Sequence, residues 1–399
     1  MNRSIALVDL IWTGHHPSYL RFFARALLEQ GCRVVAVCPQ PQEMEDWLKQ
    51  SHPAFADRFR AARAVEPGSP AGPTPLGLRA VLARWQNTRA ALAGLGESPS
   101  LVLFAWLDTL LHPLLRPWLL ERAFPHDWAG LYFHPRHLRV AAAGLRARWH
   151  ARELPAALRS RRCRGVFVLD EGVAVALSAG AGGKPVFCLP DIADTTEPDS
   201  AYALARQLRE RAAGRCVVGL AGGIAWRKGV MTLLAASRVL PPQRYFFVMA
   251  GPLIESTFPA RDREALRALA AQPPENWLLH FQRIPGEAQF NAVLAQFDVI
   301  FAAYRDFPHS SNLLAKAAWL RKPLLVSRGH LMAERTARYR LGRAIDEADA
   351  SQCARAIEEL AQGPDPAADH AGYLREHSAE RFAAVLEGAL REMRCAPPQ

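Results

Sequence analysis

The sequence predicts an α/β protein of two domains, each built on a doubly wound parallel sheet. Apolar strand-like runs alternate with helical periods along most of the chain, which is typical of this class. At 399 residues the chain is too long for one ordinary hydrophobic core. The acidic stretch 191–200 has few apolar residues and the composition of a linker. We therefore expect a first Rossmann-like domain at 1–195 and a second at 196–399.

The first domain is expected to open with a β–α–β unit. A strand at 4–11 precedes a helix whose apolar residues recur at i, i+3, i+4, i+7 and i+8 from Leu20, and Gly31 is a suitable end for that helix. A strand at 33–38 follows, so the first two strands should be parallel. The segment 66–77 holds four prolines and three glycines and is expected to be a loop or lid. Further strands are expected at 101–106, 129–133, 165–169 and 185–189.

The second domain repeats the alternation of strands and helices. Its strands are expected at 216–220, 245–250, 277–281, 298–303 and 323–327. Its helices are expected at 229–240, 261–271, 286–296, 311–321 and 350–361. The tail at 371–394 has a helical pattern as well.

The composition limits the cellular location and the classes of partner that we expect for this protein. No apolar run approaches the ~20 residues of a membrane-spanning helix, and the N-terminus is typical of a first strand and not of a signal peptide, so a cytoplasmic protein is expected. The seven cysteines form no Cys-x-x-Cys pair and are expected to be reduced and structural. The formal charge is +11, but the basic residues lack interleaved stacking aromatics, so nucleic acid is not an expected partner.

Arg227 and Lys228 lie between an apolar strand and the helix that follows it. Two cations at a helix start oppose the helix dipole unless an anion lies between them, which favours an anion site over the alternative of a solvated basic turn. Lys228 is one of only five lysines in the chain, and its ammonium is a suitable point charge for phosphate.

Ser310, Ser311 and Asn312 come directly before the helix expected to follow them. All three are N-capping residue types, and capping alone would explain one of them. Three in succession, after His309, are more typical of a ligand pocket. The two strand-to-helix turns of this domain therefore predict a phosphate-bearing ligand held by backbone N–H groups and side chains.

Histidines mark two turns of the first domain. Gly14, His15 and His16 follow the first strand, where the glycine allows close approach of a ligand to the backbone. His134 follows the strand at 129–133, at the edge where ligands bind to doubly wound sheets. A structural role for each histidine is the alternative.

Several common motifs are absent. The sequence has no Gly-x-Gly-x-x-Gly after the first strand, no Walker-type phosphate loop, no Gly-x-Ser-x-Gly and no His-Glu-x-x-His. It also has no Asp-x-Asp pair to hold a divalent cation on a diphosphate, so no metal site is expected.

The order and spacing of these pieces resemble the retaining GT-B glycosyltransferases of family 4. In that family two Rossmann-like domains face each other across a cleft, and the second binds a nucleotide-sugar donor. The likeness covers nearly the whole chain. The segments that resemble the family are the glycine turn after the first strand, Arg227-Lys228-Gly229, the strand end at 248–252, the segment 282–285 and the segment 312–327.

The resemblance implies roles for individual residues. Lys228, with Arg227 beside it, would contact the donor diphosphate, while Ser310, Ser311 and Asn312 would bind phosphate or sugar. Gly14 would let the donor approach the first-domain turn. His134 is similar to the active-site histidine of the family, and His15 and His16 are possible acceptor-side residues.

The chain departs from the family pattern in two places. It has Gly222-Gly223 where the family usually has Gly-Arg, so one diphosphate cation is missing. It has Pro308 and Lys316 where the family has two glutamates separated by seven residues, so an amine replaces the carboxylate expected to hold the nucleotide ribose. Either Lys316 contacts a phosphate or an acidic sugar of the donor, or activity has been lost.

The expected function is metal-independent transfer of a sugar from a nucleotide-sugar donor to a glycan or lipid-linked acceptor, in cell-envelope or exopolysaccharide synthesis. No cofactor is expected besides this substrate. The alternative is a GT-B-shaped subunit that binds a nucleotide or a partner without transfer. The stretch 136–164 holds nine arginines and one acid, Glu153, and is expected either to contact an anionic membrane surface at the inner membrane face or to form a solvated helix pair.

Overall fold

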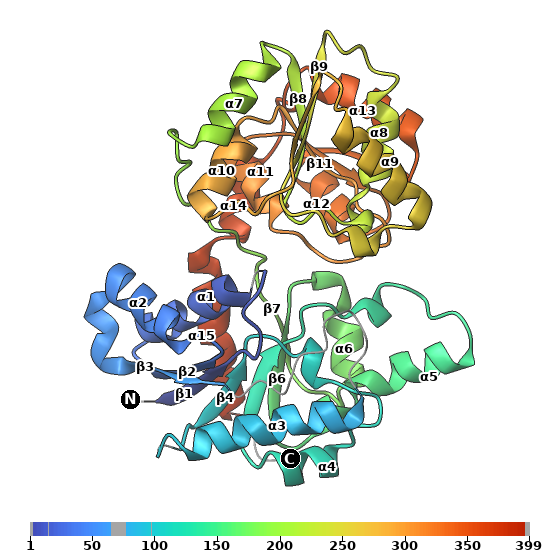
Figure 1. Cartoon of the computed structure of the whole chain (residues 1–399). Coiled ribbons are helices and arrows are strands. Elements are labelled where there is room, and N and C mark those ends of the chain that lie inside the picture. Colours follow the sequence, from blue (N-terminus) through green and yellow to red (C-terminus); the bar gives the residue numbers. More distant parts are fainter. Residues whose placement is uncertain (1–2, 15, 65–76, 97, 396–399) are drawn as a thin grey trace. The chain divides into compact units, whose positions relative to one another are not determined.

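The computed structural model describes residues 3–14, 16–64, 77–96 and 98–395, and the chain divides into two compact units (Figure 1). The first unit comprises Met1–Pro190 and Ala379–Gln399, and the second comprises Asp191–Ser378. Each is a parallel sheet between two layers of helices. His15 and nearly all of the predicted lid at 66–77 lie outside the described residues.

The first unit contains a seven-stranded sheet in the order β3-β2-β1-β4-β5-β6-β7, with every pairing parallel. Its strands are β1 (Ser4–Val8), β2 (Arg33–Cys38), β3 (Phe59–Arg63), β4 (Leu101–Phe104), β5 (Trp128–Leu131), β6 (Cys163–Val168) and β7 (Val186–Cys188). Strand β3 was not predicted. It is an edge strand in which only Phe59 is buried, so it lacks an apolar run.

Helices cover both faces of this sheet (Figure 1). One face carries α1 (His16–Glu29), α2 (Pro41–Ser51) and α15 (Ala379–Cys395), and the other carries α3 (Leu78–Ala93), α4 (Pro117–Ala123) and α6 (Ala174–Gly180). Trp85 of α3 is fully buried, with its ring 4.8 Å from Phe104 and 5.1 Å from Trp128. These aromatic contacts fix the helix layer on the sheet.

The second unit contains a six-stranded parallel sheet in the order β10-β9-β8-β11-β12-β13. Its strands are β8 (Cys216–Ala221), β9 (Tyr245–Ala250), β10 (Trp277–His280), β11 (Val299–Ala302), β12 (Leu324–Ser327) and β13 (Gly342–Ile345). One face carries α8 (Val230–Ser237), α9 (Ala260–Ala271) and α13 (Ala350–Leu360). The other carries α7 (Ala203–Ala212), α10 (Glu287–Ala295), α11 (Leu313–Leu320), α12 (Leu331–Arg338) and α14 (His370–Glu376).

The last helix belongs to the first unit. The predicted helical tail divides into α14, which ends the second unit, and α15, which packs on α1. Phe382 of α15 lies 4.9 Å from the ring of Phe23, and Gln30 donates a hydrogen bond to the carbonyl oxygen of Ala383. The structure therefore places 379–395 with the first unit, which corrects the predicted second domain of 196–399.

The segment 191–200 is packed against the second unit and is not a free linker. Asp191 and Ile192 are buried. The carbonyl oxygen of Asp194 accepts a hydrogen bond from Lys316, and that of Thr196 accepts one from Asn291. The sequence predicted a linker here because the segment is polar. These contacts leave no pattern in the sequence, because they are made by backbone carbonyls, which every residue has. Among the helices that the structure describes, none has the length and apolar character needed to cross a membrane.

Candidate functional site

The two predicted turns of the second unit lie at neighbouring strand ends. The strand order of this sheet reverses between β8 and β11, and ligands of doubly wound sheets bind at the carboxyl ends of strands at such a switch point. Arg227 and Lys228 follow β8 in a single 3-10 turn, Trp226–Lys228. Ser310, Ser311 and Asn312 follow β11. The fold thus brings both predicted segments to one edge of the sheet.

Lys228 folds back onto the end of its own strand. Its Nζ donates a hydrogen bond to the carbonyl oxygen of Ala221 at 2.8 Å and lies 5.4 Å from the centre of the Tyr304 ring. Gly222 adjoins it with φ +88°, and a Cβ there would lie 2.9 Å from Nζ, so a glycine leaves room for the ammonium. Burial, with a smaller contribution from the charge of Arg227, lowers the pKa of Lys228 to about 7.

No carboxylate pairs with Lys228 among the described residues of this edge. A lysine ammonium that is desolvated and has no countercharge gains most from an incoming anion. Arg227 is exposed, with its guanidinium 4.8 Å from the ring of Phe307 and 6.0 Å from that of Tyr304. Both cations therefore lie against the aromatic residues that follow β11.

Tyr304 connects the two turns and is not among the residues predicted from the sequence. Its hydroxyl is hydrogen-bonded to Ser311, and burial raises its pKa to about 12, so it stays neutral. Its ring contacts Phe307 at 5.3 Å and faces both cations of the β8 turn. The available signal was an aromatic residue directly after a buried strand at the switch point.

The three polar residues before α11 have different contacts. Ser310 is buried, and its hydroxyl accepts a hydrogen bond from Arg335 of α12 at 2.8 Å. The hydroxyl of Ser311 accepts the backbone N–H of Leu313 at 3.4 Å, which is a capping contact. Asn312 occupies the N-cap position without a capping bond from its side chain. Capping and core contacts thus account for part of this polar run.

Lys316 lies inside the second unit and not at the ligand edge. Only 1% of its side chain is exposed, and its Nζ donates hydrogen bonds to the Asp194 carbonyl oxygen at 2.8 Å, Glu287 at 2.7 Å and Asn291 at 2.6 Å. Three acceptors satisfy all three protons of an ammonium. The structure therefore gives Lys316 a bridging role between the 191–200 segment, α10 and α11, which differs from the predicted contact with a donor.

In the first unit the strand order reverses between β1 and β4, and predicted residues lie at that edge. Gly14 has φ +62° in the turn after β1, with open space where a Cβ would be. His16 begins α1, and its Nδ1 lies 2.9 Å from an oxygen of Asp9, which directly follows β1. Asp9 was not identified from the sequence, because a single acid after a strand carries little signal.

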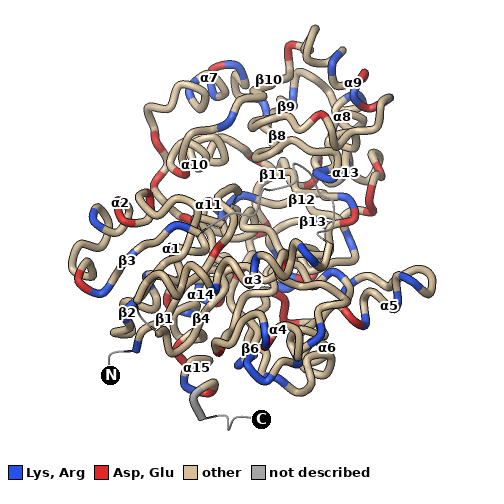
Figure 2. Tube along the Cα trace, turned by 60° about the horizontal axis from the view of Figure 1, so that its bottom comes forward, with Lys and Arg blue, Asp and Glu red and all other residues tan. Residues whose placement is uncertain are grey.

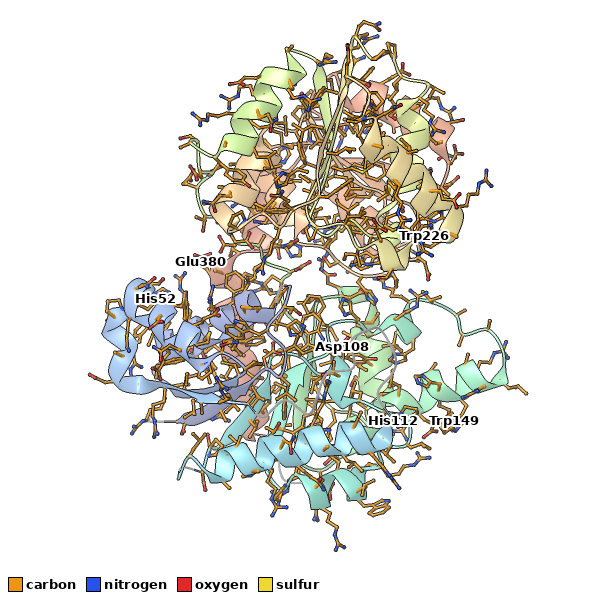
Figure 3. All side chains as sticks on the ribbon, viewed as in Figure 1. His52, Asp108, His112, Trp149, Trp226 and Glu380 are labelled. Atoms are coloured by element: carbon orange, nitrogen blue, oxygen red, sulfur yellow. The ribbon has the colours of Figure 1, made fainter. Side chains whose placement is uncertain are left out.

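His134 pairs with a second aspartate at the same edge. The carboxylate of Asp108, which follows β4, accepts the backbone N–H groups of Phe133 and His134 at 2.9 and 2.8 Å. The Nδ1 of His134 lies 3.3 Å from Asp108, and about a third of the His134 side chain is exposed. Figure 3 labels Asp108 among the side chains of this unit. Asp108 thus positions the loop that carries the predicted active-site histidine.

A stacked aromatic pair separates the two histidines. Trp106 lies 3.9 Å from the ring of His16 on one side and 4.0 Å from the ring of Phe133 on the other. Its ring centre is also 5.4 Å from that of His134. The edge therefore has two imidazole–carboxylate pairs on a rigid aromatic support, and Trp106 was not anticipated from the sequence.

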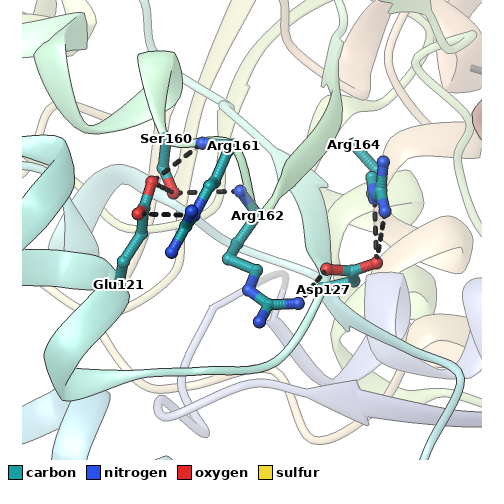
Figure 4. A network of polar contacts seen from close by, with 6 residues as sticks. All are labelled: Glu121, Asp127, Ser160, Arg161, Arg162 and Arg164. Atoms are coloured by element: carbon teal, nitrogen blue, oxygen red, sulfur yellow. Dashed lines mark hydrogen bonds and ion pairs between the residues drawn. The ribbon is translucent and has the colours of Figure 1, made fainter. Parts of the chain in front are cut away.

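Acids from elsewhere in the fold neutralise much of the arginine-rich stretch 136–164. Asp127 pairs with Arg162 and Arg164, and Glu121 pairs with Arg161 (Figure 4). Arg139 pairs with Asp170. The local excess of charge seen in the sequence is therefore smaller in the folded protein, because these acids lie outside the stretch.

The remaining arginines of that stretch include those of α5 (Leu145–Glu153), which extends from the edge of the first unit (Figure 1). None of its nine residues is buried. Arg146 and Arg148 are exposed, as are Leu145 at 85% and Trp149 at 43%, and Figure 3 labels Trp149 on this helix. Figure 2 shows the Lys and Arg positions of the chain in blue.

A cavity of about 750 Å³ lies at the opposite, amino-terminal edge of the second sheet. Its lining includes Arg215, Arg238, Asn276 and Trp277. Arg215 already donates to the carbonyl oxygens of Ala212 and Arg211, so this cation is used within the protein. Within the part of the chain that the structure describes, no group of three or more His, Cys, Asp or Glu residues is arranged to hold a metal ion.

Comparison with known proteins defines the fold. No protein-family model matches the sequence, and no curated protein matches it. Sucrose-phosphate synthase from Thermosynechococcus elongatus is similar in structure, with a TM-score of 0.69 and 16% identity over 99% of this chain and all of that one. HepE from Anabaena in complex with UDP and glucose has a TM-score of 0.64 and 14% identity, over 98% of this chain and all of that one.

A third similar structure is the trehalose-6-phosphate synthase of Burkholderia multivorans, with a TM-score of 0.63 and 14% identity over 99% of each chain. These structures are GT-B glycosyltransferases. The two parallel sheets with their helical layers therefore form the GT-B fold, as the sequence predicted. At this level of identity the likeness establishes the fold alone.

Proposed function

We propose that the protein is a glycosyltransferase that moves a sugar from a nucleotide-sugar donor to an acceptor hydroxyl. One observation carries the proposal. The desolvated ammonium of Lys228, the exposed Arg227 and the hydroxyls of Tyr304 and Ser311 meet at the switch point of the second sheet, with no carboxylate beside Lys228 among the described residues. This chemistry suits a nucleoside diphosphate.

In this proposal Lys228 and Arg227 stabilise the diphosphate as it leaves with the electron pair of the sugar–oxygen bond. Negative charge grows on the leaving group during transfer, so fixed cations stabilise the transition state more than the ground state. His134, with Asp108 holding its loop, is the proposed active-site histidine of the first unit, and Gly14 leaves room for a ligand at the turn after β1.

The proposal includes finer points that rest on the sequence resemblance. The acceptor is a glycan or a lipid-linked saccharide of cell-envelope or exopolysaccharide synthesis, and α5 brings the protein to the inner membrane face. Transfer needs no metal, since the cations of the protein replace it at the diphosphate. The proposed transfer retains the configuration at the anomeric carbon, as the resemblance to family 4 implies. Lys316 is not part of the proposed donor site.

A donor screen followed by turnover tests the proposal. UDP and UDP-glucose are suitable first probes because a HepE structure holds UDP-glucose. We expect UDP to raise the melting temperature of the wild type, and we expect release of UDP from UDP-glucose to continue in excess EDTA. Dinucleotides and free sugars serve as controls. Absence of stabilisation by any nucleotide would contradict the proposal, whereas binding without turnover would favour the alternative of a non-catalytic subunit, which the replaced glutamates at Pro308 and Lys316 suggest.

A further inference from the structure

The cavity at the amino-terminal edge of the second sheet has the size and the floor of a ligand site. Its volume of about 750 Å³ is in the range of small-molecule sites. Its floor includes the apolar side chains of Leu234, Leu240 and Leu269, which are 4%, 4% and 9% exposed. The cavity lies at the ends of the strands opposite to Lys228, so it is separate from the proposed donor site.

Two rigid loops form part of the rim. The loop before β9 has the sequence Pro-Pro-Gln at 241–243, and the loop before β10 has Gln-Pro-Pro at 272–274. Each proline fixes its own φ angle. The carbonyl oxygen of Pro242 accepts a hydrogen bond from Arg215 at 3.3 Å, and that of Pro274 accepts the backbone N–H of Trp277 at 2.9 Å. The cavity is therefore preformed, and binding to it costs little conformational entropy.

The lining carries a surplus of positive charge. Arg215 and Arg238 line the cavity, and neither forms an ion pair with a described residue. Arg215 donates to three backbone carbonyl oxygens, which hold its guanidinium in place without cancelling its charge. Among the described residues of the lining Glu275 is the only acid, so two arginines and one glutamate leave a net charge of +1. A monoanion neutralises this surplus, whereas a phosphate monoester is close to a dianion at neutral pH.

Two buried polar side chains of the lining have unused hydrogen-bonding groups. Asn276 is 6% exposed, and its amide donates a long hydrogen bond of 3.4 Å to the carbonyl oxygen of Tyr245, while no described residue donates to its Oδ1. Trp277 is 2% exposed, and no described residue accepts a hydrogen bond from its Nε1–H. Buried polar groups are normally hydrogen-bonded. A ligand that combines polar atoms with an apolar body would supply the partners that these groups lack.

We propose that this cavity binds a small carboxylic acid with an apolar body. The carboxylate lies at the rim, where Arg215 and Arg238 supply the positive charge, and the apolar body covers the leucines of the floor. Asn276 and Trp277 orient the polar atoms of the ligand. The inference does not depend on the proposed function, because the cavity and Lys228 lie at opposite edges of one sheet.

Fluorine NMR of the full-length protein labelled with 5-fluorotryptophan tests the proposal, with 2-naphthoate as the probe. The chain has ten tryptophans, and the resonance of Trp277 is the one that disappears in Trp277→Phe. For a ligand of this size we expect a dissociation constant of about 1 mM or below, and a shift of the Trp277 resonance. The resonances of Trp85 and Trp128 in the first unit should not move. A Trp277 resonance that is still unshifted at roughly ten times this concentration would overturn the proposal.

A neutral analogue and a charge reversal test the role of Arg238. 2-Naphthamide has the same apolar body without the charge and should bind more weakly than 2-naphthoate. Arg238→Glu should weaken binding of 2-naphthoate roughly tenfold, because it replaces an attraction by a repulsion, and should leave binding of 2-naphthamide unchanged. The matched control is Arg206→Glu, which reverses an exposed arginine of α7 on the other face of the sheet and should bind both probes like the wild type. Equal weakening in the two variants, or equal affinity of the wild type for acid and amide, would overturn the assignment of a carboxylate.

Two further variants locate the bound acid. Ala268 of α9 is exposed and lines the cavity, so Ala268→Phe should fill the space and abolish binding of both probes without unfolding the protein. Lys228→Ala removes a cation of the opposite edge and should bind 2-naphthoate like the wild type. Loss of binding in Lys228→Ala, or full binding in Ala268→Phe, would place the acid elsewhere and overturn the proposal. Calorimetry measures these affinities, so the result stands even if Trp277→Phe does not fold.

Discussion

Lys228 donates a 2.8 Å hydrogen bond to the carbonyl oxygen of Ala221, the last residue of β8. The contact holds a cation at the carboxyl end of the strand that borders the switch point of its sheet. It also leaves two of the three ammonium protons for other acceptors. Lys228 is therefore the residue through which the donor site is most directly tested.

Replacing Lys228 should weaken nucleotide binding without unfolding the protein. A charge-assisted hydrogen bond to phosphate contributes ~1.5–3 kcal/mol, so Lys228→Ala should weaken UDP binding by roughly one to two powers of ten. Titration calorimetry measures this. Lys322→Ala, a lysine outside the site, is the control and should bind UDP like the wild type. Equal affinity in Lys228→Ala and wild type would remove Lys228 from the donor site.

Donor affinity should fall as the pH rises above neutrality. The pKa of Lys228 is lowered to about 7 by burial, and a bound diphosphate favours the charged form and raises that pKa again. Below pH 7 the ammonium is already charged, so affinity is at its maximum. Above pH 7 binding must take up a proton, and affinity should fall by up to about tenfold per pH unit.

Calorimetry of UDP-glucose binding between pH 6.5 and 9 measures this dependence, because the diphosphate diester of a nucleotide sugar does not titrate in that range. Buffers with different ionisation enthalpies should report proton uptake in the wild type. Lys228→Ala should show a flat profile. A wild-type affinity that rises with pH would contradict the prediction.

Lys316 should matter for stability more than for binding. Its ammonium is buried and bonded to three acceptors, so Lys316→Met leaves the Oδ1 of Asn291 without the lysine donor and leaves the Asp194 carbonyl with only the 3.4 Å bond from Asn291. The partner Glu287 is 38% exposed and stays solvated, so we expect a loss on the order of 2 kcal/mol in unfolding free energy. Lys316→Glu should cost more, because it places a second carboxylate beside Glu287.

Thermal unfolding and UDP titration on the same Lys316 samples separate the two roles. The expected pattern is a lower melting temperature with UDP affinity close to wild type at a temperature where the variant is folded. The reverse pattern, a normal melting temperature with weak UDP binding, would return Lys316 to the donor site.

His377 should make the protein less stable in mild acid. Burial, followed by the charge of Arg335, lowers the pKa of His377 to about 3, and its neutral Nδ1 accepts the backbone N–H of Asp191 at 3.2 Å. The unfolded chain protonates this histidine near pH 6.5 while the folded chain does not. Stability from this group is therefore complete above pH 6.5 and is lost as the pH falls from 6.5 toward 3, by at most about 1.4 kcal/mol per pH unit.

Unfolding of wild type and His377→Gln at pH 7.5, 6 and 5 measures the effect. Glutamine does not titrate and still accepts a hydrogen bond, so the wild type should lose more stability than the variant over this range. Identical pH dependence in the two proteins would exclude His377 as a source of acid sensitivity.

The arginines of α5 should bind the protein to anionic membranes. Each cation near an anionic surface contributes ~1 kcal/mol, so reversing Arg146, Arg148 and Arg152 to Glu should reduce binding by at least about 100-fold. The wild type should sediment with anionic vesicles at low salt, remain in solution with neutral vesicles and detach as salt increases. Trp149→Ala should weaken binding at all salt concentrations, because its contribution is apolar.

The matched control for α5 reverses three exposed arginines of the second unit, Arg206, Arg209 and Arg238, which changes the net charge equally. This variant should still sediment with anionic vesicles. Equal loss in both triple variants would assign binding to net charge, and equal binding to neutral and anionic vesicles would contradict the membrane role.

The strands with continuous apolar runs could be predicted from the sequence because both faces of a parallel sheet are buried. Strands β3 and β13 could not, since each lies at a sheet edge and carries arginine, at Arg60 and Arg343. The helical tail was recognisable from its period, but its partner α1 lies more than 350 residues away in the sequence. Packing between such distant segments leaves no local pattern.

The candidate site was predictable to the extent that it lies on turns with an unusual composition. Arg227 and Lys228 break the expected charge pattern of a helix start, so the sequence indicates them as candidates. Asp9 and Asp108 follow strands singly, and only the fold shows that each pairs with a histidine. The three acceptors of Lys316 could not be predicted, because they come from segments that are distant in sequence.

The last helix, α15, returns the chain to the first unit, and this determines the order in which the two units can finish folding. Residues 191–378 are contiguous, so the second unit has all of its strands before the last helix is synthesised. The first unit lacks one helix of its layer until that point, and Phe23 has no Phe382 to cover it. Domains fold as units during synthesis. In this chain the domain whose synthesis begins first is therefore the one whose folding is completed last. A shortened C-terminus removes part of the core of that N-terminal domain.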